Sequence, residues 1–309
     1  MSEIMIQTQN LMKRYGDRKV LDSISLSVEK GEIFGFLGLN GAGKTTIIRL
    51  LLGMIRPTSG DVLLNGKRVD AGDPGLWQRV GYLVETPYAY PSFTVRENLE
   101  IVCRLRQLSG TKPIDDVLEK LKLTFYEHTK AKDLSLGNAQ KLGLAKALIH
   151  NPDILILDEP TNGLDPAGIF QVRQLLQDLA HNHGVTIFIS SHILEEMSKM
   201  VTRIGIIHQG RLIQEMSASE LNQAFHRRLW VETQQIEAAR AKLADEGYAV
   251  HLSENGLLEV ISEHAIRHPE QIAQLLVHAG LPPTLLKVEE ESLESYFLRS
   301  VGMMGGDAK

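Results

Sequence analysis

The stretch "GLNGAGKTT", residues 38–46, has the spacing Gly-x-x-x-x-Gly-Lys-Thr. Such a loop can hold a chain of phosphates, because glycines let backbone N–H groups turn inward and the next helix presents its positive end. Lys44 can then reach the β- and γ-phosphates, and Thr45 can bind Mg²⁺. A glycine turn that matches by chance is the alternative, and the strand and helix expected on either side disfavour it. The expected phosphate-loop contacts are Gly38, Asn40, Gly41, Ala42, Gly43, Lys44, Thr45 and Thr46.

A second stretch, "ILILDEP" at 154–160, is an apolar run that ends in two carboxylates. Adjacent side chains on a strand point to opposite sides, so Asp158 and Glu159 cannot do the same job. We expect Asp158 to face the Mg²⁺ ion of the phosphate loop, and Glu159 to orient or deprotonate an attacking water. A solvated strand end stopped by proline is the alternative, which the phosphate loop upstream disfavours.

His192 follows the apolar run "IFISS". An imidazole at the end of that strand can bond the terminal phosphate or its attacking water, whereas a plain helix start at 191–192 is the alternative. Ser190 and Ser191 make a serine–histidine hydrolase conceivable. The Gly-x-Ser-x-Gly pattern is absent, however, and adjacency in sequence does not make a catalytic triad.

Strands and helices must position these residues. As far as about residue 215, short apolar runs that indicate strands alternate with longer patterns that indicate helices. This order predicts an α/β fold with a mostly parallel sheet and helices on both faces. The N-terminal runs lack intervening helices, which predicts a small antiparallel sheet beside the main one. We expect buried strands at 31–38, 80–85, 154–159 and 185–191, and a helix at 44–55.

Two composition changes divide the chain. Residues from about 86 to 150 show little strand signal and several helical patterns, so we expect a helical insert within a nucleotide-binding domain at 1–218. Residues 222–309 show a strand, a helix, two strands, a helix, a strand and a short helix, an order that resembles a split β-α-β unit. The sequence therefore predicts a small α+β C-terminal domain.

The bulk composition narrows the class of protein. The 309 residues are 43% apolar and 23% charged, with a net charge of −5, which disfavours a nucleic-acid partner. Cys103 is the single cysteine, which fits a reducing compartment. We find neither a signal-peptide pattern nor an apolar run of the ~18 residues that a membrane span needs. We therefore expect a cytosolic chain, with any membrane part supplied by a separate protein.

Together these motifs resemble the ATP-binding cassette (ABC) ATPases over roughly residues 4–215. "GLNGAGKTT" matches the family's Walker A motif, and "ILILDEP" matches its Walker B motif. "NGLD" matches the D-loop of the family, and His192 matches its switch histidine. The resemblance implies ATP and Mg²⁺ as ligands, ATP hydrolysis, and Glu159 as the catalytic glutamate. It also implies that Tyr15, in "KRYG", stacks on adenine; a core aromatic at a strand end is the alternative for this residue.

The stretch "LSLGNAQKLGLAKAL", 134–148, lies where the family carries its signature, usually Leu-Ser-Gly-Gly-Gln. The resemblance implies that Ser135 and Gly137 complete the ATP site of a second cassette. A helix cap with a core stripe explains Ser135 but not Gly137. The chain departs from the signature at Leu136, where the family has glycine, and at Asn138, where it has glutamine. It also carries Glu85 where most members have glutamine. A glutamate at this position can still ligate Mg²⁺.

These departures and the C-terminal extension resemble the bacterial drug- and peptide-antibiotic export branch, of the bacitracin-resistance and lantibiotic-immunity types. The resemblance implies a second cassette subunit, an identical copy, and a separate membrane permease, which places the chain at the cytoplasmic face of the membrane. Tyr88, Tyr90 and Phe93 suit a docking groove for the permease, and packing inside the helical insert is their alternative.

Two other functions are alternatives to transport. A soluble ABC-type ATPase that acts as a regulator or assembly factor would use the same site. A single cassette, an insert too short for a long coiled coil, and the negative charge disfavour it. A phosphate-loop GTPase is disfavoured because the guanine-reading pattern Asn-Lys-x-Asp is absent.

Overall fold

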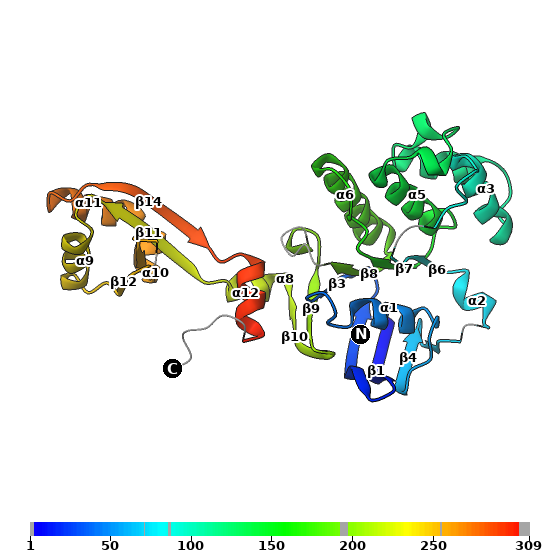
Figure 1. The fold of residues 1–309 in the computed structure, drawn as a ribbon, viewed down its shortest axis with the longest axis horizontal. Helices are drawn as coiled ribbons and strands as arrows, with labels where there is room; N and C mark the ends of the chain where they lie inside the picture. Colours follow the sequence, from blue (N-terminus) through cyan, green and yellow to red (C-terminus); the bar gives the residue numbers. More distant parts are fainter. Residues whose placement is uncertain (1–2, 71, 86–87, 192–196, 254, 303–309) are drawn as a thin grey trace. The chain divides into compact units, whose positions relative to one another are not determined.

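The structure is a computed structural model that describes residues 3–70, 72–85, 88–191, 197–253 and 255–302. It divides into two compact units, Met1–Ala218 and Ser219–Lys309 (Figure 1). The phosphate loop and both carboxylates of the predicted site lie in the first unit.

The main sheet of the first unit has six strands in the order β10-β9-β3-β8-β7-β6. Every residue of β3, β7 and β8 is buried, as expected for continuous apolar runs in a sheet covered on both faces. All neighbours pair in parallel except β10, which pairs antiparallel with β9 at one edge. The strands are β3 (Ile33–Leu37), β6 (Val80–Leu83), β7 (Ile154–Asp158), β8 (Thr186–Ser191), β9 (Arg203–His208) and β10 (Arg211–Ser217).

A second, antiparallel sheet in the same unit has the order β2-β1-β4-β5. One buried cluster includes Leu26 and Leu64 from this sheet together with Phe34 from the main sheet, so both sheets contribute to one core. The predicted α/β fold with an N-terminal antiparallel sheet is therefore confirmed. The strands are β1 (Ile4–Tyr15), β2 (Arg18–Glu29), β4 (Ser59–Leu64) and β5 (Lys67–Arg68).

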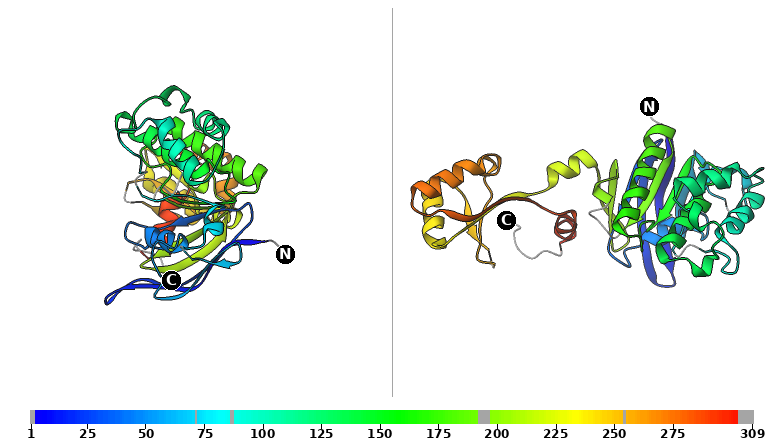
Figure 2. Two further views of the ribbon diagram at one scale, coloured as in Figure 1. Left: turned by 90° about the vertical axis from the view of Figure 1, so that its right-hand side faces the viewer. Right: turned by 90° about the horizontal axis from the view of Figure 1, so that it is seen from above.

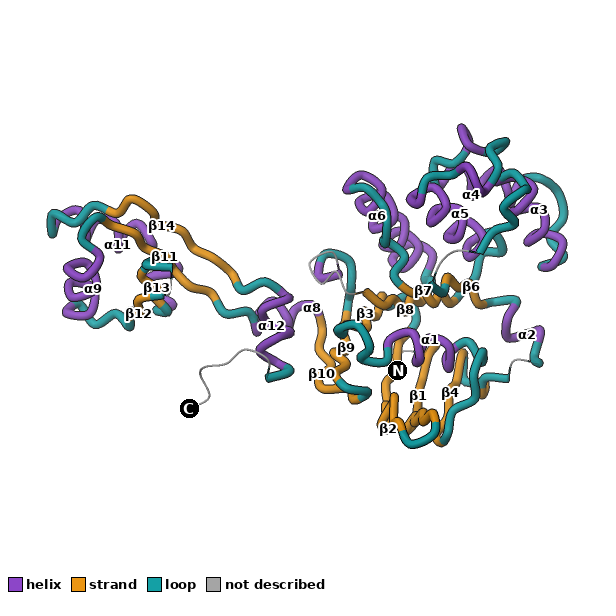
Figure 3. The backbone as a smooth tube through the Cα atoms, viewed as in Figure 1, coloured by secondary structure: helices purple, strands orange, loops and turns teal. Residues whose placement is uncertain are grey.

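Helices cover the main sheet, and α3, α4 and α5 pack against one another at one side of it (Figure 3). The long helix α6 begins with Asp165 as its N-cap and Pro166 in its first turn, and it ends at Gly184 with φ 67°. In the described part of the chain, no helix has both the length and the apolar character that a membrane span requires. The helices are α1 (Lys44–Leu51), α2 (Pro74–Trp77), α3 (Val95–Leu105), α4 (Lys112–Lys120), α5 (Leu136–Leu148), α6 (Pro166–His183), and the 3₁₀ turns η1 (Thr124–Tyr126) and η2 (Ala131–Asp133).

Two of the expected elements end two or more residues before their predicted boundaries. The helix expected at 44–55 ends at Leu51, because Gly53 adopts φ 61° and its N–H bonds back to the carbonyl of Leu50. The strand expected at 80–85 ends at Leu83, and Glu85 adopts φ 53°. In both cases a left-handed residue interrupts a continuous apolar pattern.

The second unit contains a four-stranded antiparallel sheet in the order β12-β13-β11-β14. β11 and β14 run side by side over most of their length (Figures 1 and 2). Its own core includes Leu229, Leu258 and Ile272. The helix expected after the two strands is α11, which starts at Pro269, and a short helix α10 that the sequence did not indicate precedes it. The elements are α8 (Ala218–Ala224), β11 (Arg227–Thr233), α9 (Ile236–Asp245), β12 (Val250–Leu252), β13 (Leu258–Val260), α10 (Glu263–Arg267), α11 (Pro269–His278), β14 (Pro283–Glu290) and α12 (Leu293–Ser300).

Candidate functional site

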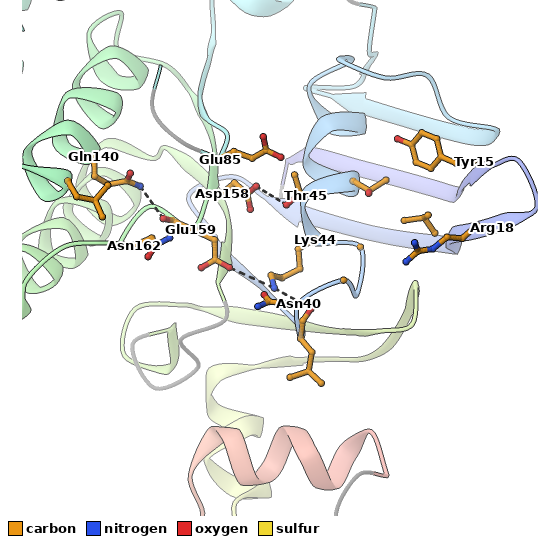
Figure 4. A pocket seen from close by; sticks show the side chains of 16 residues that line it. Tyr15, Arg18, Asn40, Lys44, Thr45, Glu85, Gln140, Asp158, Glu159 and Asn162 are labelled. Carbon is orange, nitrogen blue, oxygen red and sulfur yellow. Dashed lines mark hydrogen bonds and ion pairs between the residues drawn. The ribbon is translucent and has the colours of Figure 1, made fainter. Parts of the chain in front are cut away.

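A cavity of about 790 Å³ opens in the first unit where the phosphate loop meets the carboxyl ends of β3 and β7 (Figure 4). Tyr15 and Arg18 lie at one side of it, and Gln140 and Asn162 at the other. The predicted site residues that line the cavity are Tyr15, Asn40, Gly41, Gly43, Lys44, Thr45, Thr46, Glu85, Asp158 and Glu159.

The phosphate loop requires glycine at two of its positions. A Cβ atom at Gly43, which has φ 116°, would lie 2.7 Å from a methyl carbon of Leu21, and one at Gly38 would lie 2.7 Å from the carbonyl oxygen of Ile207. Helix α1 starts at Lys44 without a side-chain cap and has no acidic residue in its first turn. The N–H groups at this helix end are thus available to an anion, which fits a bound phosphate.

Lys44 is the buried cation of the cavity, with only 7% of its surface exposed. Its ammonium donates to the carbonyl oxygen of Gly38 at 2.7 Å and lies 3.8 Å from the carboxylate of Glu159, toward which it points (Figure 4). Burial lowers the pKa of Lys44, and the charges of Glu159 and Asp158 oppose that shift. The ammonium is therefore held between a carbonyl and a carboxylate at the start of α1.

Thr45 and Asp158 place two oxygen groups that could bind a metal ion side by side in the cavity. The Thr45 hydroxyl donates to the Asp158 carboxylate at 3.0 Å, and the Ser190 hydroxyl donates to the other oxygen of that carboxylate. A hydroxyl and a carboxylate are hard oxygen ligands of the kind Mg²⁺ takes beside phosphate, so the donor set fits this ion. Glu85 also lines the cavity, but its carboxylate is paired with the guanidinium of Arg49 on α1.

Glu159 follows β7 and adopts a left-handed backbone conformation, with φ 49°. Its N–H donates to the carbonyl oxygen of Ser190 at 3.2 Å. Its own carbonyl oxygen accepts from the N–H of Asn162 and from the side-chain amide of Gln140, both at 3.1 Å. This turn separates the direction of the Glu159 side chain from that of Asp158, whose carboxylate faces Thr45.

A contact at the N-terminal end of α5 explains why residue 137 is glycine, and the sequence did not suggest this contact. A Cβ atom there would lie 3.3 Å from the carbonyl oxygen of Gly163, so glycine permits a close approach of α5 to the D-loop. A helix cap with a core stripe does not account for Gly137, whereas this contact with Gly163, outside the helix, does. Ser135 caps α5 by accepting the N–H of Asn138 at 3.3 Å. Leu136, between them, packs over Gly163 and lines the cavity.

Comparison with known proteins decides the family. Residues 21–162 match the sequence model of the ABC transporter family. The chain is 39% identical over 302 residues to the bacitracin transport ATP-binding protein BcrA of Bacillus licheniformis, covering 96% of this chain and 97% of that protein. The chain belongs to the ABC transporter ATP-binding proteins. This ABC ATPase binds ATP and hydrolyses it, and the predicted resemblance is confirmed.

Further relatives of the ABC ATPase match about two thirds of its length. It is 37% identical over 211 residues to the lantibiotic transport ATP-binding protein SrtF of Streptococcus pyogenes, covering 68% of this chain and 90% of that protein. The structure of the ATP-binding subunit of an ABC transporter aligns with a TM-score of 0.66 at 27% identity, covering 71% and 92% of the two chains. A dimeric cassette in a post-hydrolysis state, bound to ADP and Pi, aligns with a TM-score of 0.64 at 25% identity, covering 69% and 99%.

The remaining predicted residues of the ABC ATPase lie as follows. The Tyr15 ring is 50% exposed at the rim of the cavity, with the ammonium of Lys13 4.8 Å from its centroid, so packing in the core does not account for it. Gly38 and Ala42 are not among the lining residues, although the carbonyl of Gly38 holds Lys44. Ser135 and Gly137 lie beside the cavity rather than in its lining. His192 lies outside the described residues.

Sequence reasoning missed four residues that the structure of the ABC ATPase brings to the site. Arg18 and Asn162 line the cavity, Ser190 bonds to Asp158, and Gln140 bonds to the backbone of Glu159. Asn162 and Ser190 lay inside stretches already singled out, next to residues of interest. Gln140 also lies inside a stretch already singled out, 134–148, but nothing in the local pattern marks it or Arg18, because their positions depend on contacts between distant segments.

Proposed function

We propose that this ABC ATPase powers the export of a peptide antibiotic through a separate membrane permease. The observation that carries the proposal is the match to a bacitracin transport ATP-binding protein, which runs through both units of the chain. The lantibiotic transport relative supports the same class of substrate. A soluble regulator or assembly factor that uses the same site is the alternative, and no relative reported above favours it.

In the proposed hydrolysis, each predicted residue has one task. The N–H groups of the phosphate loop and the ammonium of Lys44 hold the phosphates, and the Tyr15 ring stacks on the adenine. Glu159 accepts the proton of the attacking water at its carboxylate, and His192 contacts the terminal phosphate. Mg²⁺, held by Thr45, Asp158 and Glu85, would neutralise charge that develops on the phosphate oxygens.

We propose that the complete site needs a second copy of the chain, with Ser135 and Gly137 completing the partner's nucleotide site. The α5 N-terminus suits this task, because the positive end of a helix favours an anion and Gly137 keeps the backbone accessible. The alignment with a cassette solved as a dimer supports the arrangement. The Ser135 oxygen accepts a hydrogen bond within α5, so its hydroxyl hydrogen remains able to donate.

A groove of about 590 Å³ beside the nucleotide cavity is the proposed docking site for the permease, at the cytoplasmic face of the membrane. Exposed apolar side chains line it, Leu105 being 76% exposed and Tyr88 71%. The Tyr90 ring contacts Tyr88 edge to face and Phe93 at a tilt of 38°, with 5.7 Å between the ring centroids in each pair. The charged residues of the lining have a net positive charge, which fits an apolar helix of the permease flanked by carboxylates. They are Arg49, Glu85, Arg106 and Lys146. Glu85 lines this groove and the nucleotide cavity alike.

Substitution in this groove tests the docking. We expect Leu105→Asp to abolish co-purification of a multi-span membrane protein from detergent extract, because a carboxylate added to the apolar lining would have to be desolvated against the bound helix. The ATPase rate of the isolated chain should not change, since Leu105 is exposed. Phe125→Asp is the matched control, at an apolar side chain 90% exposed outside the groove. Equal recovery of the membrane protein with both variants would contradict the docking site.

A growth assay tests the proposed substrate class. Host cells whose only copy of the chain carries Glu159→Gln should be inhibited by lower concentrations of bacitracin than wild-type cells, because export stops when ATP is not hydrolysed. Inhibition by chloramphenicol, a small drug that is not a peptide, should be the same in both strains. Greater sensitivity to chloramphenicol alone would point to drug export. Unchanged sensitivity to both compounds and to lantibiotics would contradict export of peptide antibiotics.

A further inference from the structure

We propose that Gln140 is a positioning residue for ATP hydrolysis: from helix α5, its amide holds the backbone of Glu159 in the conformation that directs the carboxylate toward Lys44 and the phosphates. The inference rests on the proposed role of Glu159 as the base. Gln140 lies in the signature stretch 134–148, at a position to which the family resemblance assigned no task.

The backbone of Glu159 needs support because of its conformation. A left-handed φ of 49° at a residue with a Cβ atom is unfavourable by roughly 1–2 kcal/mol, and it persists only where surrounding contacts hold it. Among the described residues, backbone hydrogen bonds to Ser190 and from Asn162 contribute. A side chain contributes as well, since the amide of Gln140 donates to the Glu159 carbonyl oxygen at 3.1 Å (Figure 4).

The environment of Gln140 suits this task. The residue is only 3% exposed, and it lines the nucleotide cavity from the second turn of α5. An amide withdrawn from water keeps its hydrogen bond strongly, because an unpaired buried donor or acceptor costs about 1–3 kcal/mol. Helix α5 therefore fixes the position of the Gln140 amide, and this amide in turn holds the carbonyl oxygen of Glu159.

Two further contacts join the same end of α5 to the turn that follows Glu159. Leu136 packs over Gly163, where a Cβ atom would overlap the leucine side chain, and Gly137 approaches the Gly163 carbonyl. Leu136 and Gln140 are four residues apart and so lie on one face of the helix. A displacement of this face would move the backbone of Glu159 directly. Because a reacting group displaced by about 1 Å can cost on the order of 10²-fold in rate, a single tether of this kind has a measurable effect.

The decisive experiment compares two replacements of Gln140 in the full-length protein. Gln140→Met keeps the length of the side chain but removes the donor, so kcat for ATP hydrolysis should fall about 10- to 100-fold at every pH. The Kd for ATP and the thermal unfolding midpoint should stay close to wild type, because the amide contacts neither the phosphate loop nor the adenine side of the cavity.

Gln140→Glu adds a pH signature. An ionised carboxylate cannot donate to the Glu159 carbonyl, whereas a protonated one can, and burial beside Asp158 and Glu159 raises the pKa of the introduced group, an effect that Lys44 opposes. The ratio of variant to wild-type kcat should therefore be low at pH 8 and should rise as the pH is lowered toward 6. Every other group of the site is common to both proteins, so its own pH dependence largely cancels in the ratio.

Gln171→Met is the matched control. It removes the amide oxygen that accepts from Lys141 of the same α5 helix at 3.4 Å, a link to α6 that does not reach Glu159, so kcat should be unchanged. Wild-type kcat in Gln140→Met, or a loss of kcat matched by an equal loss of ATP affinity or stability, would overturn the positioning role. If Glu159→Gln itself keeps full turnover, the assignment of the base fails instead, so the two failures can be told apart.

Discussion

Replacing Glu159 by glutamine is expected to lower kcat for ATP hydrolysis by about 10²- to 10⁴-fold, the usual contribution of a general base. Glutamine keeps the size of the side chain, and the hydrogen bonds that hold this turn involve the backbone of residue 159, so the geometry should persist. The ability to accept a proton is lost, together with the ion pair to the Lys44 ammonium. ATP binding should be retained, because the phosphate loop is unchanged and Lys44 keeps its hydrogen bond to the Gly38 carbonyl.

Such a variant should therefore accumulate as an ATP-bound dimer, which size-exclusion chromatography with and without ATP would detect. Phosphate release measured under saturating ATP gives kcat. Glu119→Gln makes the same chemical change at an exposed position of α4 outside the cavity and should behave as wild type. Turnover in Glu159→Gln at the rate of this control would show that another group takes the proton.

Replacing Lys44 by alanine is expected to remove ATP binding rather than the chemical step alone. Lys44 is buried, and its ammonium lies beside Glu159 in the lining that also contains Asp158. Without the cation, two carboxylates would face the phosphates unopposed. Truncating one partner of a buried charge pair typically costs about 2–5 kcal/mol, so the Kd for ATP should rise roughly 30- to 5000-fold.

Isothermal titration calorimetry with ATP, followed by a thermal unfolding scan without nucleotide, would measure this effect and check that the fold survives. Lys19→Ala is the control, because Lys19 lies on β2 near the loop, pairs with Asp22 at 3.0 Å and is outside the cavity lining. A Kd for Lys44→Ala within twofold of this control would mean that Lys44 does not hold the phosphates.

Much of the fold and part of the candidate site could be predicted because the relevant signals are local. The buried strands β3, β7 and β8 appear as unbroken apolar runs, since both faces of the main sheet are covered. The spacing of the phosphate loop identifies Lys44 and Thr45, because the loop and the helix that follows it form one continuous segment.

What could not be predicted depends on contacts between distant segments. Gln140 reaches Glu159 across 19 positions of sequence, and the need for glycine at 137 arises from a carbonyl at position 163. The left-handed turn at Glu159 is equally hidden, because its residue type does not favour positive φ. The pairing of Glu85 with Arg49 also required the structure, since it joins the end of β6 to α1.

The division of the chain after Ala218 has a consequence for how such a protein can change over generations. The core of the second unit contains Leu229, Val231 and Ile272, and among the described residues it has no member in common with the core beneath the phosphate loop. Mutations that repack one core leave the packing of the other unaltered. Selection can therefore remodel the C-terminal unit, or a gene fusion can replace it, while the machinery of hydrolysis is inherited unchanged.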